Sequence, residues 1–461
     1  MASYETIGAI VFLVFLTLYF ALSKKSLDIK SYKNYGFLAM RRTKLGLKLM
    51  DSLSKYKRIV KLYGYLGVIL GFLGMLMMVA FFGHSVYLIF KEPASPPPVG
   101  FVVPFETDTP GVLGIPFSYW IISIFIIALV HEFSHGVVAR AFNIKVKSSG
   151  FMFIGIGLRI AGYVIALFSL LSKRLEYMNL HSLTIDFLNY ATPEFWLFVG
   201  ILLVIISYFH DFWIPIIPAA FVEPDEKDLK KRPLMEQLSV YAAGPMANFV
   251  LVGILMLGSM FVVDPFVEKL AVKDGVIITD YAVENINGVN VTYPIERAGI
   301  NKGERIIGID GKLILSHEEL TQALKNKKPD DKITLNTNVS TYKIQLAKNP
   351  KDENMGYMGV YLQQSIKLEN SVKERYGDIL PAISWFVGLY GMLIFLNLGI
   401  GIFNLLPAGP LDGGRMLYST LLKKFNKEKA AGIFAKISIV LGIVVLFFMA
   451  IIMKNIFFHF F

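Results

Sequence analysis

Residues 131–135 read HEFSH, and they lie within an apolar run from 118 to 141 in which every charged group is expensive. On a helix, His131 and His135 are one turn apart on the same face, so both imidazoles can bind a single metal ion. Glu132 flanks the same position. This H-E-x-x-H spacing is typical of zinc enzymes in which the glutamate is the general base for a zinc-bound water.

A catalytic zinc also needs a third protein ligand and an open position. The chain has no cysteine, so the ligand must be a histidine or a carboxylate. Asp412, in the segment NLLPAGPLDGG, follows an apolar run at about 379–403 and is predicted at the same membrane depth as HEFSH. The prolines of this segment break the helix, and its paired glycines permit close backbone approach. Irregular backbone at that depth is tolerated where it lines a cavity or is buried in protein.

The composition indicates a polytopic membrane protein. Of the 461 residues, 54% are apolar, and the mean hydropathy is +0.55. The net charge of +11 is best explained by basic cytoplasmic loops beside anionic lipid, so we expect a bilayer and no nucleic acid as partner. Twelve Lys and Arg between residues 23 and 62 predict that this loop is cytoplasmic, and the loop is compatible with a soluble or a membrane-surface helix. The first apolar run lacks a basic segment before it, so we expect a retained span with the N-terminus outside.

The apolar runs predict seven or eight crossings, and the two counts differ in how residues 148–220 are arranged. Within that region, 149–158 and 212–222 have the character of strands, and two further runs are either crossings or re-entrant elements. The predicted spans are at about 7–22, 63–90, 118–141, 236–262, 379–403 and 432–453, with the two further runs at about 160–172 and 194–209.

Residues 265–375 differ from the rest because they are polar, rich in turns and contain alternating strands. They are long enough for one small domain of about 100 residues. Counting the predicted crossings from the cytoplasmic basic loop places this domain on the outside of the membrane. The expected division is therefore 1–92 for the first spans and the basic loop, 93–264 for the first part of a catalytic core, 265–375 for the inserted domain and 376–461 for the second part of the core.

Together, HEFSHG, NLLPAGPLDGGR and AAGPMANF resemble the motifs of the site-2 protease family of intramembrane zinc metalloproteases. The resemblance covers most of the chain from about residue 95 and leaves 160–210 as an apparent insertion. It implies an α-helical polytopic fold with a membrane-embedded sheet at 149–158 and 212–222, either of which would hold a substrate extended.

The same resemblance assigns roles to single residues. His131, His135 and Asp412 would hold one zinc ion per chain, and Glu132 would activate water and protonate the leaving amine. Asn404 would hold the substrate backbone or stabilise the oxyanion, and Asn248 would support the site. A purely structural interhelical hydrogen bond is the alternative for both asparagines.

The segment PIERAGINKGERIIGIDGK (294–312) resembles the core of a PDZ domain, and SHEELTQALKN (316–326) resembles its second helix. Such domains bind peptides by strand addition. The segment GYMGVYL (356–362) is the candidate pairing strand, which makes Gly356, Tyr357, Met358 and Gly359 candidate substrate-binding residues. Alternatively, the domain keeps the fold and only packs against the membrane part.

These observations predict an intramembrane zinc metalloendopeptidase in the plasma membrane of a prokaryote. Its substrates would be single-span proteins already shortened by another protease, and its active site would face the cytoplasmic side. A zinc transporter is one alternative, although a transporter would require ligands on both sides of a transport pathway. A catalytically dead membrane scaffold with a PDZ-like domain is the other, although the ligands and the base are intact.

Overall fold

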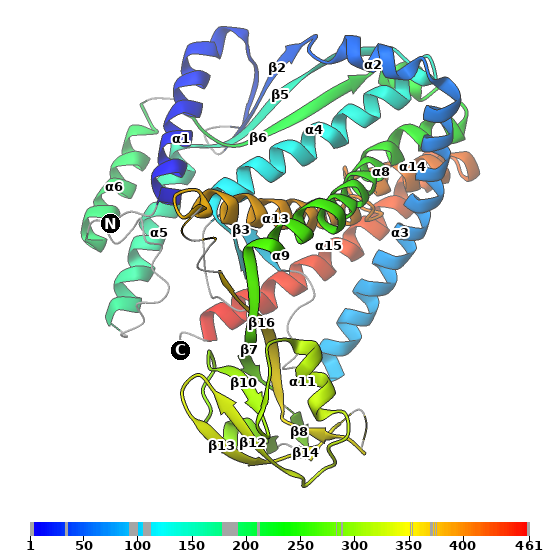
Figure 1. Ribbon diagram of the computed structural model, residues 1–461. Helices are drawn as coiled ribbons and strands as arrows, with labels where there is room; N and C mark the ends of the chain where they lie inside the picture. The colour runs from blue at the N-terminus through cyan, green and yellow to red at the C-terminus, as the bar shows by residue number, and fades with distance from the viewer. Residues whose placement is uncertain are drawn as a thin grey trace. The chain divides into compact units, whose positions relative to one another are not determined.

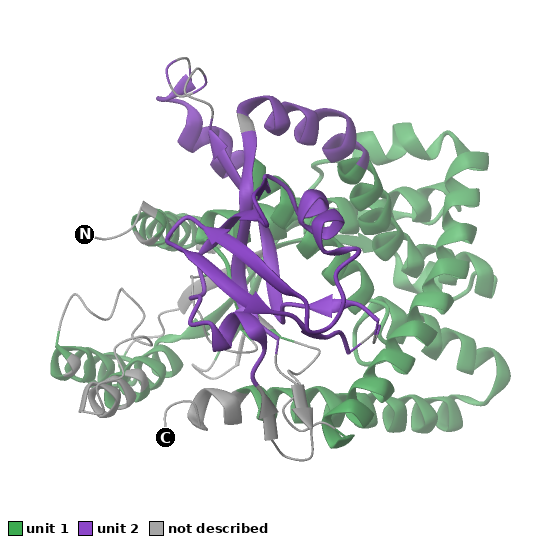
Figure 2. Cartoon of the chain, turned by 60° about the horizontal axis from the view of Figure 1, so that its bottom comes forward, with its two compact units in different colours: residues 1–256, 387–461 green, residues 257–386 purple. Residues whose placement is uncertain are grey.

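The computed structural model describes residues 4–458 apart from 33–35, 92–99, 105–111, 178–191, 210–212, 283, 287–288, 351, 353, 369–371, 373 and 375. The chain divides into two compact units, shown in Figure 2. Unit 1 comprises residues 1–256 and 387–461, and unit 2 comprises residues 257–386. Unit 2 therefore encloses the segment 265–375 that was expected to form an inserted domain.

Among the described residues, five helices are long and apolar enough to cross a membrane. This supports a polytopic membrane protein, while the predicted count of seven or eight crossings remains a prediction. The apolar helices α1, α5 and α6 are shorter. The five long segments (Figure 1) are α3 (Lys57–Lys91), α4 (Phe117–Ala141), α8 (Leu234–Gly258) with its continuation through η4 (Ser259–Val263) and α9 (Asp264–Leu270), α13 (Leu380–Phe403) and α15 (Lys427–Phe458).

The helices α5 (Leu158–Tyr177) and α6 (Pro193–Ile206) pack against each other through small residues. A Cβ atom built on Gly162 would lie 2.6 Å from the carbonyl oxygen of Gly200. One built on Gly200 would lie 2.7 Å from the backbone nitrogen of Ala166. Small side chains at such a crossing let two apolar helices approach closely, as in membrane-embedded pairs. The two ambiguous apolar runs are thus a pair of packed helices.

Unit 1 also contains a four-stranded antiparallel sheet with the order β1-β2-β5-β6. Of the two segments predicted as strands, residues 149–157 lie in β5 and residues 213–222 lie in β6. The basic loop contains a helix, α2, as the sequence allowed, and its first part forms β1 and β2, which were not predicted from the sequence. The strands are β1 (Asp28–Tyr32), β2 (Gly36–Thr43), β5 (Val146–Gly157) and β6 (Trp213–Pro224).

The hairpin of β1 and β2 forms because alternate side chains of β2 have an apolar surface to cover. Phe37 and Ala39 are buried in a cluster with Leu16 and Phe20 of α1 (Tyr4–Ser23) and with Phe153 of β5. The side-chain period of a strand is two, so the residues between them face away. The remaining helices of unit 1 are α2 (Leu47–Ser54), α7 (Glu226–Leu229) and α14 (Asp412–Lys424), with the short η1 (Lys24–Ser26) and the parallel pair β3 (Phe101–Val103) and β4 (Val112–Gly114).

Unit 2 combines a sheet with the short helices α10 and α11 around an apolar core. The main sheet has the order β13-β12-β10-β7-β16, with β11 paired to β10, so β16 lies at one end. A capping box of Ser316 and Glu319 starts α11. Buried isoleucines, among them Ile306, Ile309 and Ile333, fill the core. The elements are β7 (Ala271–Tyr281), β8 (Glu284–Ile286), β9 (Val289–Val291), α10 (Pro294–Arg297), β10 (Arg305–Ile309), β11 (Lys312–Leu313), α11 (His317–Leu324), β12 (Lys332–Thr337), β13 (Thr341–Gln345), β14 (Ala347–Lys348), β15 (Gly356–Tyr357) and β16 (Val360–Leu368).

Candidate metal centre

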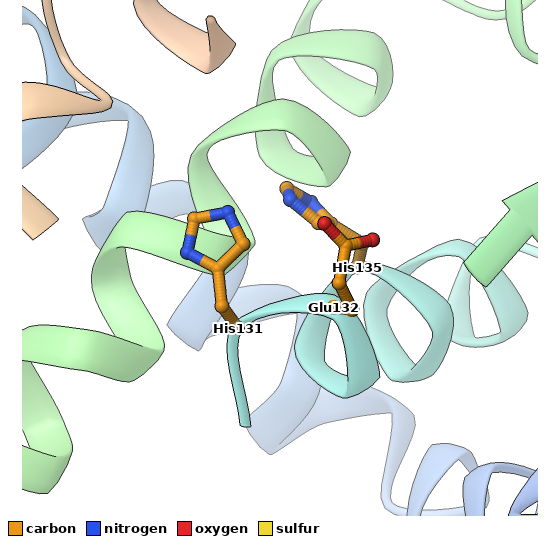
Figure 3. A group of neighbouring side chains, drawn as sticks. All are labelled: His131, Glu132 and His135. Atoms are coloured by element: carbon orange, nitrogen blue, oxygen red, sulfur yellow. The ribbon is translucent and has the colours of Figure 1, made fainter. Parts of the chain in front are cut away.

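The helix α4 presents His131, Glu132 and His135 together (Figure 3). Their potential ligand atoms all lie within 4.8 Å of one another. The two imidazole rings are nearly perpendicular, with centroids 4.9 Å apart. Both histidines are buried, and Glu132 is half-buried. The helix therefore places two nitrogen ligands and a carboxylate around one point, as the spacing of four predicted.

Asp412 begins α14 and reaches the same two imidazoles. Its Oδ2 lies 2.9 Å from Nε2 of His131 and 3.4 Å from Nε2 of His135. The turn before α14 is tight. A Cβ atom on Gly414 would lie 2.7 Å from the carbonyl oxygens of Ala408 and Gly409. Glycine is required at such a close approach, which explains why the aspartate is followed by glycines.

The helix α8 passes the three candidate ligands at a glycine. A Cβ atom on Gly244 would lie 2.5 Å from Nε2 of His135 and closer still to Nε2 of His131. Any side chain there would occupy the space in front of the ligand atoms. Two imidazole nitrogens and one carboxylate oxygen are a donor set that zinc accepts, with a fourth position left for water. The residues therefore fit a catalytic zinc site.

Each imidazole also has a partner on its other nitrogen. His135 Nδ1 lies 2.6 Å from the carbonyl oxygen of Val240, and His131 Nδ1 lies 3.2 Å from the side-chain amide of Asn248. A histidine that binds metal through Nε2 carries its proton on Nδ1 and donates it to such a partner. Asn248 Oδ1 has no hydrogen-bond partner within the described part of the chain. Rotating the side-chain amide of Asn248 by 180° exchanges the positions of Oδ1 and Nδ2 and brings Oδ1 to His131 Nδ1. The hydrogen-bond network decides between the two orientations of such an amide.

A further asparagine, Asn397 on α13, supports this arrangement and was missed in the sequence. It is fully buried, and its Nδ2 donates to the backbone carbonyl of Asn248 at 3.0 Å. One turn later, a Cβ atom on Gly401 would lie 2.9 Å from Asn248 Cβ, so α13 and α8 touch there. The sequence feature that could have revealed Asn397 is an amide inside an apolar run, because a buried amide requires a hydrogen-bond partner.

Glu132 contacts the last strand of the sheet. Its Oε2 accepts a hydrogen bond from the backbone nitrogen of Val222 at 3.3 Å. Among the residues that the structure describes, β6 pairs with β5 alone, whereas β5 lies between β2 and β6. Residues 149–156 of β5 are paired on both sides. The expectation that 149–158 could pair with a substrate is therefore wrong, because both edges of this strand are already paired. Of the two expected segments, the one in β6 is still able to pair with a substrate.

Asn404 lies at the turn between α13 and α14, and it is half-buried. Its backbone carbonyl accepts a hydrogen bond from Gly413 at 2.8 Å. The contacts described for Asn404 thus join its backbone to the residue after Asp412, and its side-chain role stays a prediction.

The four candidate peptide-binding residues lie in unit 2, just before the strand that ends its sheet. Gly356 and Tyr357 are paired with β14, and Met358 is buried in the core. The carbonyl oxygen of Gly359 accepts a hydrogen bond from Ala282. The residues of GYMGVYL that lie in β16 itself are Val360, Tyr361 and Leu362.

Residues 181–448, more than half of the chain, match the model of peptidase family M50. The matched region contains Asp412, Asn248 and Asn397 and begins after His135. Two similar proteins are the zinc metalloprotease RasP of Shouchella clausii, 27% identical over 43% of this chain and 54% of its own length, and the regulator of sigma-W protease RasP of Bacillus subtilis, 26% identical over 46% and 57%. The chain thus spans about half the length of these relatives.

An uncharacterised protein of Methanocaldococcus jannaschii is 36% identical over 31% of this chain and 36% of its own length. Among solved structures, the PDZ domain of an SdrC-like protein of Listeria monocytogenes is similar over 19% of this chain and 87% of that domain, with 22% identity and a TM-score of 0.16.

Proposed function

Since the chain belongs to peptidase family M50, we propose that it is an intramembrane zinc metalloendopeptidase that cuts transmembrane segments of single-span proteins. The observation that carries this proposal is the convergence of His131, His135 and Asp412 beside Glu132. The five long apolar helices supply the membrane setting, because α4 is one of them and carries three of the four residues.

The proposed chemistry divides between the metal and the side chains. Zinc, when bound by His131, His135 and Asp412, lowers the pKa of a bound water to about 7. Glu132 takes a proton from the attacking water and returns it to the leaving nitrogen. Asn248 and the carbonyl of Val240 hold the two imidazoles in the tautomer that presents Nε2 to the ion. Asn404 is proposed to hold the substrate backbone or to stabilise the oxyanion.

A transmembrane substrate must unwind before it is cut, because an α-helix uses its carbonyls in hydrogen bonds four residues apart. The strand β6 is the proposed support for the extended segment. It lies at the end of the sheet, and its Val222 N–H already contacts Glu132. A substrate paired there by strand addition would have its backbone beside the general base.

The remaining proposals concern placement. We place unit 2 and the N-terminus outside, the metal centre toward the cytoplasmic side, and one zinc in each chain, in a prokaryotic plasma membrane with seven or eight crossings. The proposed boundaries are those expected from the sequence, at 92, 264 and 375. Unit 2, with its end strand β16 and α11, is proposed either to exclude large ectodomains or to bind a substrate already shortened by another protease.

The decisive experiment compares Glu132→Gln with the wild-type chain, using zinc analysis and cleavage of a single-span reporter in vesicles. Gln keeps the shape of the side chain but cannot act as a base, so zinc content should be unchanged. Cleavage should fall by about 10²–10⁴-fold. Glu268→Gln, at an exposed position of α9, is the matched control and should behave as wild type. Undiminished cleavage by Glu132→Gln would exclude the mechanism.

A further inference from the structure

The short helix α2 joins the sheet of unit 1 to the long helix α3 and has three distinct faces. Met50 and Ser54 are buried. Leu49 and Leu53, four residues apart and so on one face, are 56% and 40% exposed. The third face carries Lys48, Asp51 and Lys55, which are all exposed. An eight-residue helix with two apolar faces has more apolar surface than the protein covers.

The buried face of α2 lies against the turn of α4 that carries the metal-ligand motif. Met50 packs in one cluster with Phe133 and Val137. A Cβ atom on Gly136 would lie 2.6 Å from the sulfur of Met50. An ion pair of 3.1 Å joins Asp51 to Arg140 at the end of α4. The helix α2 therefore contacts the segment between Glu132 and Arg140, and Met50 shares its cluster with Val240 of α8.

The exposed apolar face of α2 continues along the chain into a predicted membrane span. Leu45 precedes α2, and it is 70% exposed. Tyr56, Ile59 and Leu62 follow α2 and are also exposed, and the last two lie on α3. The exposed apolar residues of α3 need a lipid environment because this helix is one of the five long apolar segments. The same environment is available to α2 at the end of α3.

The charges around this face complement an anionic surface. Lys44, Lys48 and Lys55 are exposed beside the leucines, and the acid of the same helix, Asp51, is paired with Arg140. Basic residues beside an anionic leaflet are attracted to its headgroups. A helix with an apolar face and lysines beside it is typical of segments that lie in the plane of the membrane interface.

We propose that α2 is an interfacial helix that binds anionic phospholipid, with Leu45, Leu49 and Leu53 at the acyl boundary and Lys44, Lys48 and Lys55 at the headgroups. The lipid surface thereby supports the turn of α4 that carries HEFSH, through Met50 and the Asp51–Arg140 pair. A protein partner on the same face is the competing occupant, and the experiment below separates the two.

The natural chain has no cysteine, so a single nitroxide label can be placed at Leu49→Cys in the full-length protein. The labelled protein is reconstituted in vesicles of phosphatidylcholine with phosphatidylglycerol, and the label's collisions with oxygen and with a water-soluble nickel chelate are measured. The label should favour oxygen, and its contact with the chelate should be several-fold lower than that of a label at Ser340→Cys, an exposed residue of unit 2. Equal contact with the chelate at both positions would overturn the proposal.

The anionic part of the proposal is tested by removing charge. In vesicles of phosphatidylcholine alone, or with Lys44, Lys48 and Lys55 all changed to Gln, the label at position 49 should become more accessible to the chelate. The matched control changes three exposed lysines of unit 2, Lys312, Lys325 and Lys332, to Gln and should leave the label unchanged. A label whose depth ignores both lipid charge and the first triple change would overturn the anionic part of the proposal. Neither readout depends on catalysis.

Discussion

Each unit of the molecule buries a carboxylate, and the two carboxylates have opposite surroundings. Glu304 in unit 2 is 5% exposed and is surrounded by donors. The backbone nitrogen of Asn301 donates to it at 2.9 Å, the hydroxyl of Thr337 at 2.8 Å and that of Tyr342 at 3.3 Å. Asp412 in unit 1 is 6% exposed and lies instead against two imidazole nitrogens.

This difference separates a structural carboxylate from a candidate ligand. Burial alone would raise the pKa of Glu304, but the donors of Asn301, Thr337 and Tyr342 lower it overall, so the charged form is satisfied by protein alone. At Asp412, the two histidines use Nδ1 toward other partners and present Nε2 to the carboxylate. Lone pairs that converge from three side chains are stabilised together by a cation.

The largest predicted effect comes from filling the space between these lone pairs. In Gly244→Ala, the added methyl group would fall beside Nε2 of both histidines, so zinc binding should be lost although no ligand is changed. Gly253→Ala is the matched control, because a Cβ atom there, on the same helix α8, meets nothing within 4 Å. Zinc bound to the purified variants is measured by atomic absorption. Equal zinc in both variants would show that the ion lies elsewhere.

A smaller effect is expected from the partners of the ligands. Asn248→Ala removes the side chain on Nδ1 of His131, and losses of this kind reduce metal affinity by about 10- to 100-fold. Asn397→Ala should have a weaker effect in the same direction, because its amide contacts Asn248 and not the histidine. Competition with a zinc chelator gives both affinities. Wild-type affinity in Asn248→Ala would leave Asn248 with a packing role alone.

Glu304→Gln should have no effect on the zinc affinity. It replaces charged hydrogen bonds in unit 2, so we expect unit 2 to lose about 1–3 kcal/mol of stability at neutral pH. Because the folded pKa of Glu304 is lowered, its wild-type contribution is complete above the ordinary value of 4.5 and is lost as the pH falls below it. Thermal unfolding of the full chain at pH 7 and at pH 3.5 measures this. The two proteins should differ less at the lower pH, and an equal difference at both would contradict the assignment.

The candidate ligands were easier to predict from the sequence than the scaffold around them. HEFSH and Asp412 could be predicted to lie together because each is near the predicted inner end of an apolar run, and the two runs are predicted to cross the membrane in the same direction. The pairing of β1 and β2 could not be predicted. The alternation of Phe37 and Ala39 is short, and it lies in a segment whose most prominent feature is its basic residues. Asn397 was missed because one amide in an apolar run has no motif spacing, and its partner is the backbone of a distant helix.

The central claim is that His131, His135 and Asp412 hold one zinc ion. X-ray absorption at the zinc edge of the purified full-length protein tests it most directly. The account predicts one zinc per chain, nitrogen and oxygen neighbours at about 2.0–2.2 Å, and the outer-shell scattering of two imidazoles. Asp412→Ala should lose the metal or exchange one oxygen neighbour. A zinc site with a different number of imidazoles, or one that Asp412→Ala leaves unchanged, would contradict the account.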